Sequence, residues 1–188
     1  MRAYRCLILA ESFALTSALV RGDERIIPCH DVTKLDFTNL TISNRIHHNT
    51  RQLAFKNGVA LGYDDPEIEK SGPPDWKAEI ERDTVVQPAP GISVRFLFIY
   101  QHHLTGTGWN YWLVGYSCSN GRLRQVFSRD GLSLKIERLD DSGIVVSKLL
   151  KYGSPIETHW SYIWEKAQLN YVLASKRADP APKSNNPK

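Results

Sequence analysis

Sulfur-containing residues are scarce in this sequence, which has three cysteines and one methionine among its 188 residues. The spacings typical of zinc sites, such as Cys-x-x-Cys, His-x-His and His-Glu-x-x-His, are missing. Histidine occurs in the adjacent pairs His47-His48 and His102-His103, and neighbours on a regular strand point to opposite faces and cannot share one ion. We therefore predict no metal; a site assembled from His102, His159 and Asp64 is the alternative.

Motifs of nucleophilic and nucleotide chemistry are also absent. Gly-x-Ser-x-Gly does not occur, and no glycine-rich loop leads into a helix. Cys118 with a histidine could form a thiol nucleophile, but its position at the end of an apolar strand, just before Asn120-Gly121, suits a structural role better. The acidic pairs Asp64-Asp65 and Asp140-Asp141 lie in turn sequences, where aspartate bonds to nearby backbone. We predict no catalytic residue and no cofactor.

Long apolar runs are missing too. The nearest candidate, Cys6 to Ala18, is shorter than the roughly 20 residues that span a bilayer. It follows a basic start and ends in the small residues Thr16-Ser17-Ala18, which is typical of a secretory signal peptide over residues 1–18. Glu11 interrupts the apolar stretch and leaves an uncleaved amphipathic helix as the alternative. We expect a periplasmic or secreted protein whose mature form has no membrane span.

The cysteines support export. Cleavage after Ala18 removes Cys6 and leaves Cys29 and Cys118, an even number. In an oxidising compartment these two are expected to form a disulfide, which closes a long loop and contributes about 2–4 kcal/mol to stability. Two separate buried thiols are the alternative, because cysteine often serves as a small core residue.

A concentrated positive charge is also lacking. The net charge of +4 comes from 24 basic and 20 acidic residues, but residues 1–18 and 176–188 carry the whole excess, and 18 of each sign remain between them. Proteins that bind nucleic acid gather lysine and arginine on the folded surface. We therefore expect no nucleic-acid partner. Residues 176–188 are rich in proline, serine and asparagine and are predicted to be a disordered tail, which leaves residues 19–175 as one domain.

Turn sequences are abundant, by contrast. Asn57-Gly58, Asn120-Gly121 and Asp130-Gly131 favour the positive φ angles of two-residue hairpin turns. Thr105 to Gly108 and Asp140 to Gly143 are longer loops of the same kind. These turns recur at intervals of about ten residues, which predicts an antiparallel β-meander.

The segments between the turns read as strands. Ile92 to Tyr100 and Trp109 to Tyr116 become apolar on both faces, which predicts a central hairpin covered on two sides. In Leu132 to Arg138, apolar and polar residues alternate, which indicates a half-buried strand. Further strands are predicted at Leu35 to Ile42, Ile144 to Ser147 and Tyr171 to Ala174.

Helix signals are weak. Pro74 to Arg82 could be a short helix or irregular loop, which we favour because Gly72-Pro73-Pro74 precedes it, or a strand. The predicted fold is mainly β: an antiparallel meander forming a sandwich or a strongly curved sheet, with at most one or two short helices.

Aromatic residues give the best indication of a site. Trp160, Tyr162 and Trp164 recur at period two and so share one face of a strand. Such a row can stack against sugars or bind peptide segments, with Tyr and Trp tips supplying hydrogen bonds. The alternative, which we consider stronger, is that these residues fill the core.

The layout resembles a family of small exported bacterial β-rich proteins. The likeness rests on the signal-like start, the meander and four segments: Leu35 to Asn39, Phe55 to Val59, Trp164 to Lys166, and Tyr171 to Ala174. In that family the last hairpin has an acidic-Gly turn, where this chain has Glu165 and a longer connection. The resemblance implies a bacterial cell-envelope setting and no activity.

These observations favour a non-enzymatic exported domain of the cell envelope. Its role would be structural or binding, with an unknown envelope protein or a glycan as partner. The alternative is an envelope hydrolase with a histidine-containing pocket, which requires a histidine within hydrogen-bond reach of a carboxylate or of Cys118.

Overall fold

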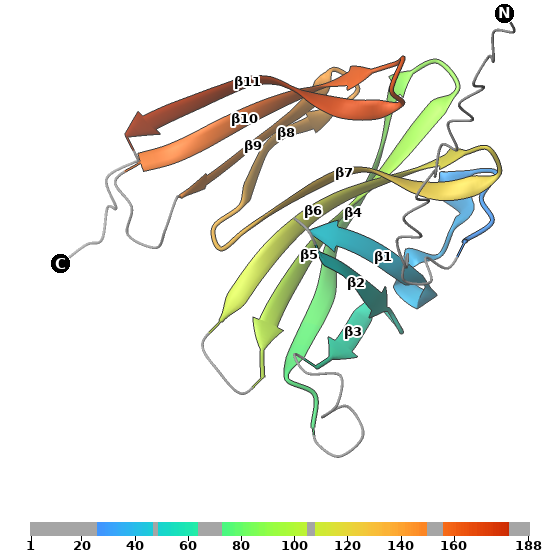
Figure 1. Ribbon diagram of the computed structural model, residues 1–188, viewed down its shortest axis with the longest axis vertical. Coiled ribbons are helices and arrows are strands. Elements are labelled where there is room, and N and C mark those ends of the chain that lie inside the picture. The colour runs from blue at the N-terminus through green and yellow to red at the C-terminus, as the bar shows by residue number, and fades with distance from the viewer. Residues whose placement is uncertain (1–25, 47–48, 64–72, 105–107, 150–155, 181–188) are drawn as a thin grey trace, which may run out of the picture.

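The computed structural model describes residues 26–46, 49–63, 73–104, 108–149 and 156–180. The chain folds almost entirely into antiparallel β-structure, as predicted, and its strands form three sheets (Figure 1). Strands that follow each other in sequence are neighbours in every sheet, which is the arrangement of a meander.

A strongly curled central sheet has the order β3-β4-β5-β6-β7. Its strands are β3 (Val59–Gly62), β4 (Trp76–Ala89), β5 (Ile92–His103), β6 (Trp109–Ser119) and β7 (Arg122–Gly131). The register shifts within the β4–β5 pair and within the β6–β7 pair. Such bulges increase the local twist of a sheet, and they account for the half-barrel curl.

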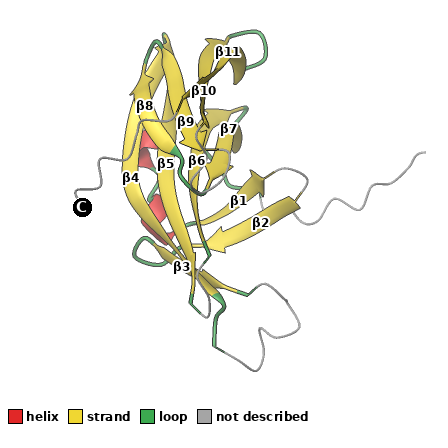
Figure 2. Ribbon diagram, turned by 90° about the vertical axis from the view of Figure 1, so that its left-hand side faces the viewer, coloured by secondary structure: helices red, strands yellow, loops and turns green. Residues whose placement is uncertain are grey.

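Two smaller sheets complete the fold. The second sheet has the order β11-β10-β9-β8 and consists of β8 (Lys135–Asp140), β9 (Gly143–Leu149), β10 (Ile156–Glu165) and β11 (Asn170–Pro180). The third is the hairpin of β1 (Thr41–Ile46) and β2 (Asn49–Ala54). Before them lie two 3₁₀ turns, η1 (Val32–Lys34) and η2 (Phe37–Asn39), seen in red beside the central sheet in Figure 2.

The central sheet is buried on both faces, as predicted for its central hairpin. On β5, Val94 and Phe96 belong to a core shared with the second sheet, whereas Leu97 and Ile99 belong to a core shared with the N-terminal segment and β1–β2. All four side chains are at most 1% exposed. Side chains alternate between the two faces of β5, so this strand packs against the second sheet on one face and against the N-terminal segment with β1–β2 on the other.

Gly115 on β6 lets the second core close around Phe96. A Cβ atom at Gly115 would lie 2.6 Å from Cε1 of Phe96, a distance that no side chain tolerates. We expect Gly115→Ala to lower the free energy of unfolding by about 1–3 kcal/mol, because the overpacked ring must leave its position. Denaturant titration of Gly115→Ala, Phe96→Leu and the double variant checks this. If the loss of stability in the double variant equals or exceeds the sum of the losses in the two single variants, the contact between Gly115 and Phe96 is contradicted.

Local turn chemistry is mostly confirmed. Asn57 and Gly58 have φ angles of 53° and 79°, and Asn120 and Gly121, which join β6 to β7, have φ angles of 53° and 72°. The Thr105 to Gly108 loop falls largely outside the described residues. The expectation of a hairpin turn at Asp130-Gly131 is wrong: both residues stay in β7, paired with Trp112 and Tyr111. The chain turns just afterwards, so the strand predicted from Leu132 begins only at Lys135.

Two other predictions differ from the structure. Pro74 to Arg82 contributes to the long strand β4 rather than a helix or loop, because its backbone pairs with β5 on one side and β3 on the other. The strand expected from Leu35 starts only at Thr41. Before it, the Asp36 carboxylate accepts a hydrogen bond of 3.1 Å from the backbone N–H of Thr38 and caps the turn η2.

The C-terminal strand is longer than predicted. β11 runs on to Pro180, and Lys176 to Pro180 pair with Ile156 to Trp160 although the tail was expected to be disordered from residue 176. Backbone pairing creates this end of the strand, since most of its side chains are exposed. Residues 1–25 and 181–188, which include the predicted signal peptide, lie outside the described residues. In the described part of the chain, no helix has the length and apolar character needed to cross a membrane.

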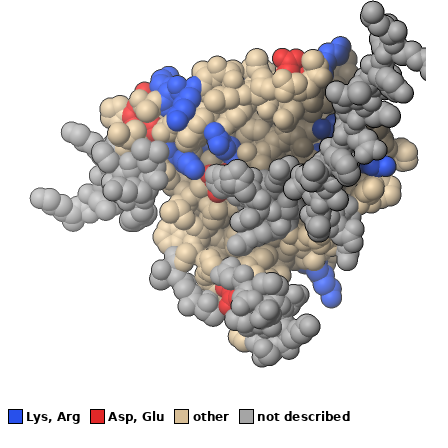
Figure 3. All heavy atoms as spheres, viewed as in Figure 1, with Lys and Arg blue, Asp and Glu red and all other residues tan. Residues whose placement is uncertain are grey.

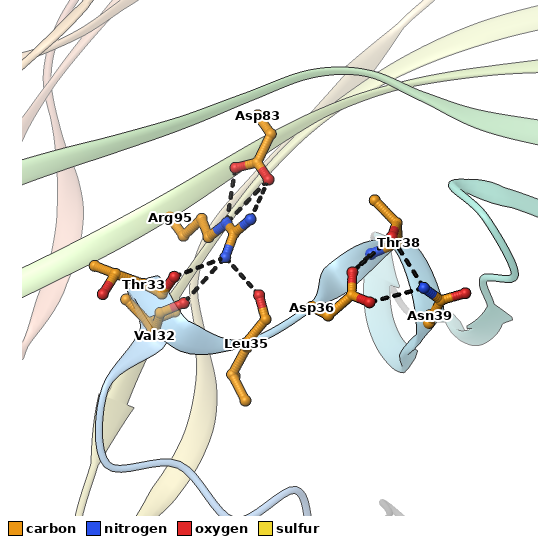
Figure 4. Close-up of polar contacts among 8 residues, drawn as sticks. All are labelled: Val32, Thr33, Leu35, Asp36, Thr38, Asn39, Asp83 and Arg95. Atoms are coloured by element: carbon orange, nitrogen blue, oxygen red, sulfur yellow. Dashed lines mark hydrogen bonds and ion pairs between the residues drawn. The ribbon is translucent and has the colours of Figure 1, made fainter.

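Arg95 on β5 fixes the N-terminal segment to the central sheet (Figure 4). Its Nε lies 2.8 Å from Oδ1 of Asp83, and its Nη2 lies 2.5 Å from Oδ2 of the same carboxylate. Its Nη1 donates to the carbonyl oxygens of Leu35, Thr33 and Val32 at 2.5, 3.3 and 3.4 Å. The guanidinium carbon also lies 5.1 Å from the ring centroid of Phe37. One side chain thus satisfies three loop carbonyls around η1.

Candidate functional site

The predicted aromatic row on β10 lies between the two large sheets. Trp160 and Tyr162 are each 7% exposed, and Trp164 is partly buried against the same core. Tyr162 packs edge-on to Phe127 of β7 at 4.9 Å, and Trp164 packs edge-on to Tyr171 of β11 at 5.1 Å. The row is therefore a lining of the space between the sheets rather than an open surface, and any ligand must reach it from the edge.

A cleft of about 340 Å³ opens at that edge. It lies between β7, the last strand of the central sheet, and the β10–β11 hairpin of the second sheet. In Figure 1, β7 runs across the molecule below the second sheet, and β7 and β11 are in contact. The residues that line the cleft are Gln125, Val126, Phe127, Ser128 and Arg129 from β7, Tyr162 from β10, and Asn170, Tyr171 and Leu173 from β11.

Arg129 is the charged residue of the cleft. It pairs with Leu113 across β6–β7, and Leu113 belongs to the second core, so Arg129 points toward the space between the sheets. Its guanidinium carbon lies 4.9 Å from the ring centroid of Trp160 and 5.5 Å from that of Tyr162. Such stacking is worth about 0.5–2 kcal/mol. The two rings therefore contact the guanidinium and help to fix its position.

The charge of Arg129 has no counterion in the described part of the chain. Its Nε is buried without a hydrogen-bond partner, and none of the ion pairs between described residues involves it. A buried donor without an acceptor costs free energy, and Arg129 itself is partly exposed. Lys148, a second cation near Trp160, is bonded to the backbone oxygen of Asp130 at 3.2 Å and adds positive charge at this edge.

Two tyrosine hydroxyls add unused hydrogen-bonding capacity. The hydroxyl of Tyr171 is buried and has no partner among the described residues. Burial raises its pKa, and the nearby carboxylates of Asp141 and Asp140 raise it further. Burial also raises the pKa of Tyr162, although the Arg129 guanidinium close to it acts in the opposite direction. Both side chains are therefore neutral at physiological pH and available as donors.

The histidines discussed as candidate ligands, His102 and His159, do not line the cleft. His159 is on the outer face of the second sheet, with Nδ1 2.7 Å from Oε1 of Glu137 and Nε2 3.6 Å from Oδ2 of Asp179. His102 is in β5 of the central sheet, and Asp64 lies outside the described residues. No group of three potential metal ligands occurs within the described ranges. The described residues lining the cleft include neither a histidine nor a carboxylate.

Cys118 forms a structural contact with Cys29. Cys29 and Cys118 lie at disulfide distance with Cα atoms 5.3 Å apart, as predicted for this pair. The backbone beside them is also joined, since the N–H of Cys29 donates to the carbonyl oxygen of Gly121 at 2.9 Å. A thiol in this arrangement does not serve as a nucleophile.

Surface charge does not single out another site. On the face shown in Figure 3, Lys and Arg side chains occupy several separate places, and carboxylates lie beside the largest group. The cleft combines a charged side chain with buried polar groups that have no partner among the described residues.

Sequence reasoning identified Tyr162 but missed Arg129 and Tyr171. A signal for Arg129 is present, because it lies two residues after Phe127 and therefore on the same side of the strand. An arginine in phase with an apolar residue of an alternating strand points toward the core.

Comparison of the chain with protein-family models, with curated proteins and with solved structures finds no match. Its function must therefore be inferred from the geometry of the cleft.

Proposed function

We propose that this chain is a non-enzymatic exported domain of the cell envelope that binds a small ligand in the cleft between β7 and β10–β11. One observation carries the proposal: Arg129 and Tyr171 present buried polar groups to the cleft that no described residue satisfies. Buried polar groups in folded proteins nearly always have partners. A ligand that enters the cleft would supply them.

The cysteine pair supports an exported setting. Cys29 and Cys118 lie at disulfide distance, and disulfides persist mainly in oxidising compartments. The signal-like residues 1–18 are consistent with the same route.

A hydrolase is less well supported. It requires a histidine in a pocket with a carboxylate or a free thiol. His159 contacts Glu137 and Asp179 on an outer face, away from the residues that line the cleft. The binding role therefore fits the arrangement better.

The binding role is tested by blocking the cleft. Leu173 lines the cleft and is 52% exposed, so Leu173→Trp should fill the entrance without disturbing the core. Ile163, on the neighbouring strand and 47% exposed, is not among the lining residues, and Ile163→Trp is the matched control. The probes are three monosaccharides of different charge: glucose, glucuronate and glucosamine.

We expect at least one of these sugars to shift the backbone amide NMR signals of residues 125–129 and 170–173 in the wild type. The shifts should be lost in Leu173→Trp and retained in Ile163→Trp. Absence of shifts at these residues with all three sugars at millimolar concentration, or equal shifts in both variants, would contradict the proposed site.

A further inference from the structure

We infer that the ligand of the cleft is an anionic sugar, a hexuronate, whose carboxylate pairs with the stacked guanidinium of Arg129 while its hydroxyl groups meet Tyr162 and Tyr171. This inference rests on the binding function proposed above and specifies its ligand class. It is argued from the charge, the hydrogen-bonding groups and the size of the cleft.

The charge of the ligand follows from Arg129. Arg129 is partly exposed, and its guanidinium contributes a positive charge to the cleft. The guanidinium carbon lies over the rings of Trp160 and Tyr162, and the buried Nε has no hydrogen-bond partner among the described residues. A carboxylate matches this planar fork with two parallel hydrogen bonds. The buried Nε is therefore able to donate to such an anion.

The protein itself offers no anion to this guanidinium within the described residues. The carboxylates of Asp140 and Asp141 are near enough to Tyr171 to raise its pKa. Asp140 is the last residue of β8 and Asp141 follows it, however, and neither residue lines the cleft. Lys148 on the neighbouring strand β9 increases the positive charge further. The local field therefore favours an anionic ligand over a neutral or cationic one.

The hydroxyl groups of the ligand follow from the remaining lining. Among the lining residues, Arg129, Tyr162 and Tyr171 carry polar groups and belong to the strand faces that meet at the second core. Such a lining suits a polyhydroxylated molecule and not a fatty acyl chain.

The size of the cleft limits the ligand. Its volume of about 340 Å³ is at the low end of the roughly 300–1,000 Å³ found for small-molecule sites. One sugar ring with its substituents suits this volume, and a folded partner or an extended peptide does not. A planar carboxylate presents two oxygens to the guanidinium of Arg129, and a phosphate monoester is the anionic alternative included in the test.

The test measures the affinities of glucuronate, glucose and glucose 6-phosphate by calorimetry and by amide NMR shifts. In the wild type we expect glucuronate to bind at least about tenfold more tightly than glucose, because only glucuronate pairs with Arg129. Arg129→Met should weaken glucuronate binding by about tenfold or more, and by a larger factor than it weakens glucose binding. Methionine can retain the contact with the Trp160 ring, so the fold should be preserved.

Two further variants sharpen the test. Arg124→Gln removes an exposed arginine of the same strand that does not line the cleft, and it should bind glucuronate like the wild type. Arg129→Lys keeps the charge but loses the planar fork, so its glucuronate affinity should fall between those of the wild type and Arg129→Met.

Equal affinity for glucuronate and glucose in the wild type, tighter binding of glucose 6-phosphate than of glucuronate, or an equal loss in Arg124→Gln would overturn the inference. Each of these results leaves the proposed binding function standing, because a sugar still occupies the cleft. Failure of all three sugars of the cleft-blocking experiment to bind would instead remove the binding function and this inference with it.

Discussion

Replacing Arg95 with methionine is expected to lower the free energy of unfolding by about 2–4 kcal/mol. The guanidinium pairs with Asp83 through two nitrogens and donates to three loop carbonyls around η1. Arg95 and Asp83 are 16% and 29% exposed, so solvent replaces these bonds only in part. The variant would leave a half-buried carboxylate and several carbonyl oxygens without a donor. Urea titration of the folded protein measures the effect.

Two controls separate the carboxylate pair from the loop contacts. Asp83→Asn removes the charge of the pair but leaves the donors for the loop carbonyls in place, so it should cost less than Arg95→Met. Arg95→Lys retains a charge but cannot bond to Asp83 and three carbonyls at once, so it should resemble Arg95→Met more than the wild type. If Arg95→Lys has the stability of the wild type, the contacts to the loop contribute little and the prediction is wrong.

The parts of the fold that could be predicted depend on local chemistry. Asn57-Gly58 and Asn120-Gly121 adopt positive φ angles because these residue types tolerate them with little strain, whatever the rest of the chain does. The apolar run of β5 indicated burial on both faces, because exposing apolar side chains on either face to water is unfavourable. These signals were sufficient for an antiparallel meander.

The errors occur where pairing between strands decides the outcome. Trp76, Ala78 and Ile80 fit both a helical and an alternating pattern, and the ladder with β5 selects the strand. Asp130-Gly131 has turn chemistry, yet pairing with β6 continues through it. Lys176 to Pro180 has no apolar periodicity, but the backbone of β10 provides its partner. In each case the deciding contact is distant in sequence.

The candidate site was only partly predictable for a related reason. Alternation places Trp160, Tyr162 and Trp164 on one face, but whether that face meets solvent or another sheet depends on the packing of the layers. The cleft also needs Arg129 from a strand more than 30 residues earlier in the chain. The spacing of residues within one strand carries no information about which residues of another strand lie beside it.

Removal of the cysteine pair is expected to be the second large effect. The N-terminal segment touches β7 through the bridge between Pro28 and Arg122 and through the hydrogen bond from Leu123 N–H to the Ile27 oxygen, at 2.9 Å. These contacts are few, and Cys29 at 2% exposure forms part of the first core. A covalent link between residues 89 positions apart restricts the unfolded chain strongly. We expect Cys29→Ala/Cys118→Ala to be less stable than the oxidised wild type by about 3–4 kcal/mol.

The size of this effect can be separated from that of the lost side-chain packing. Wild-type protein treated with a reductant keeps both sulfur atoms but loses the link, so its urea midpoint should fall close to that of the double alanine variant. Non-reducing peptide mapping of protein recovered from an oxidising compartment should yield the fragment that joins Cys29 to Cys118. Free thiols at both positions in that material, or a midpoint unaffected by reductant, would refute the link. Either result would also remove the main structural support for export, because the cysteine pair would then be two core residues of the kind found in any compartment.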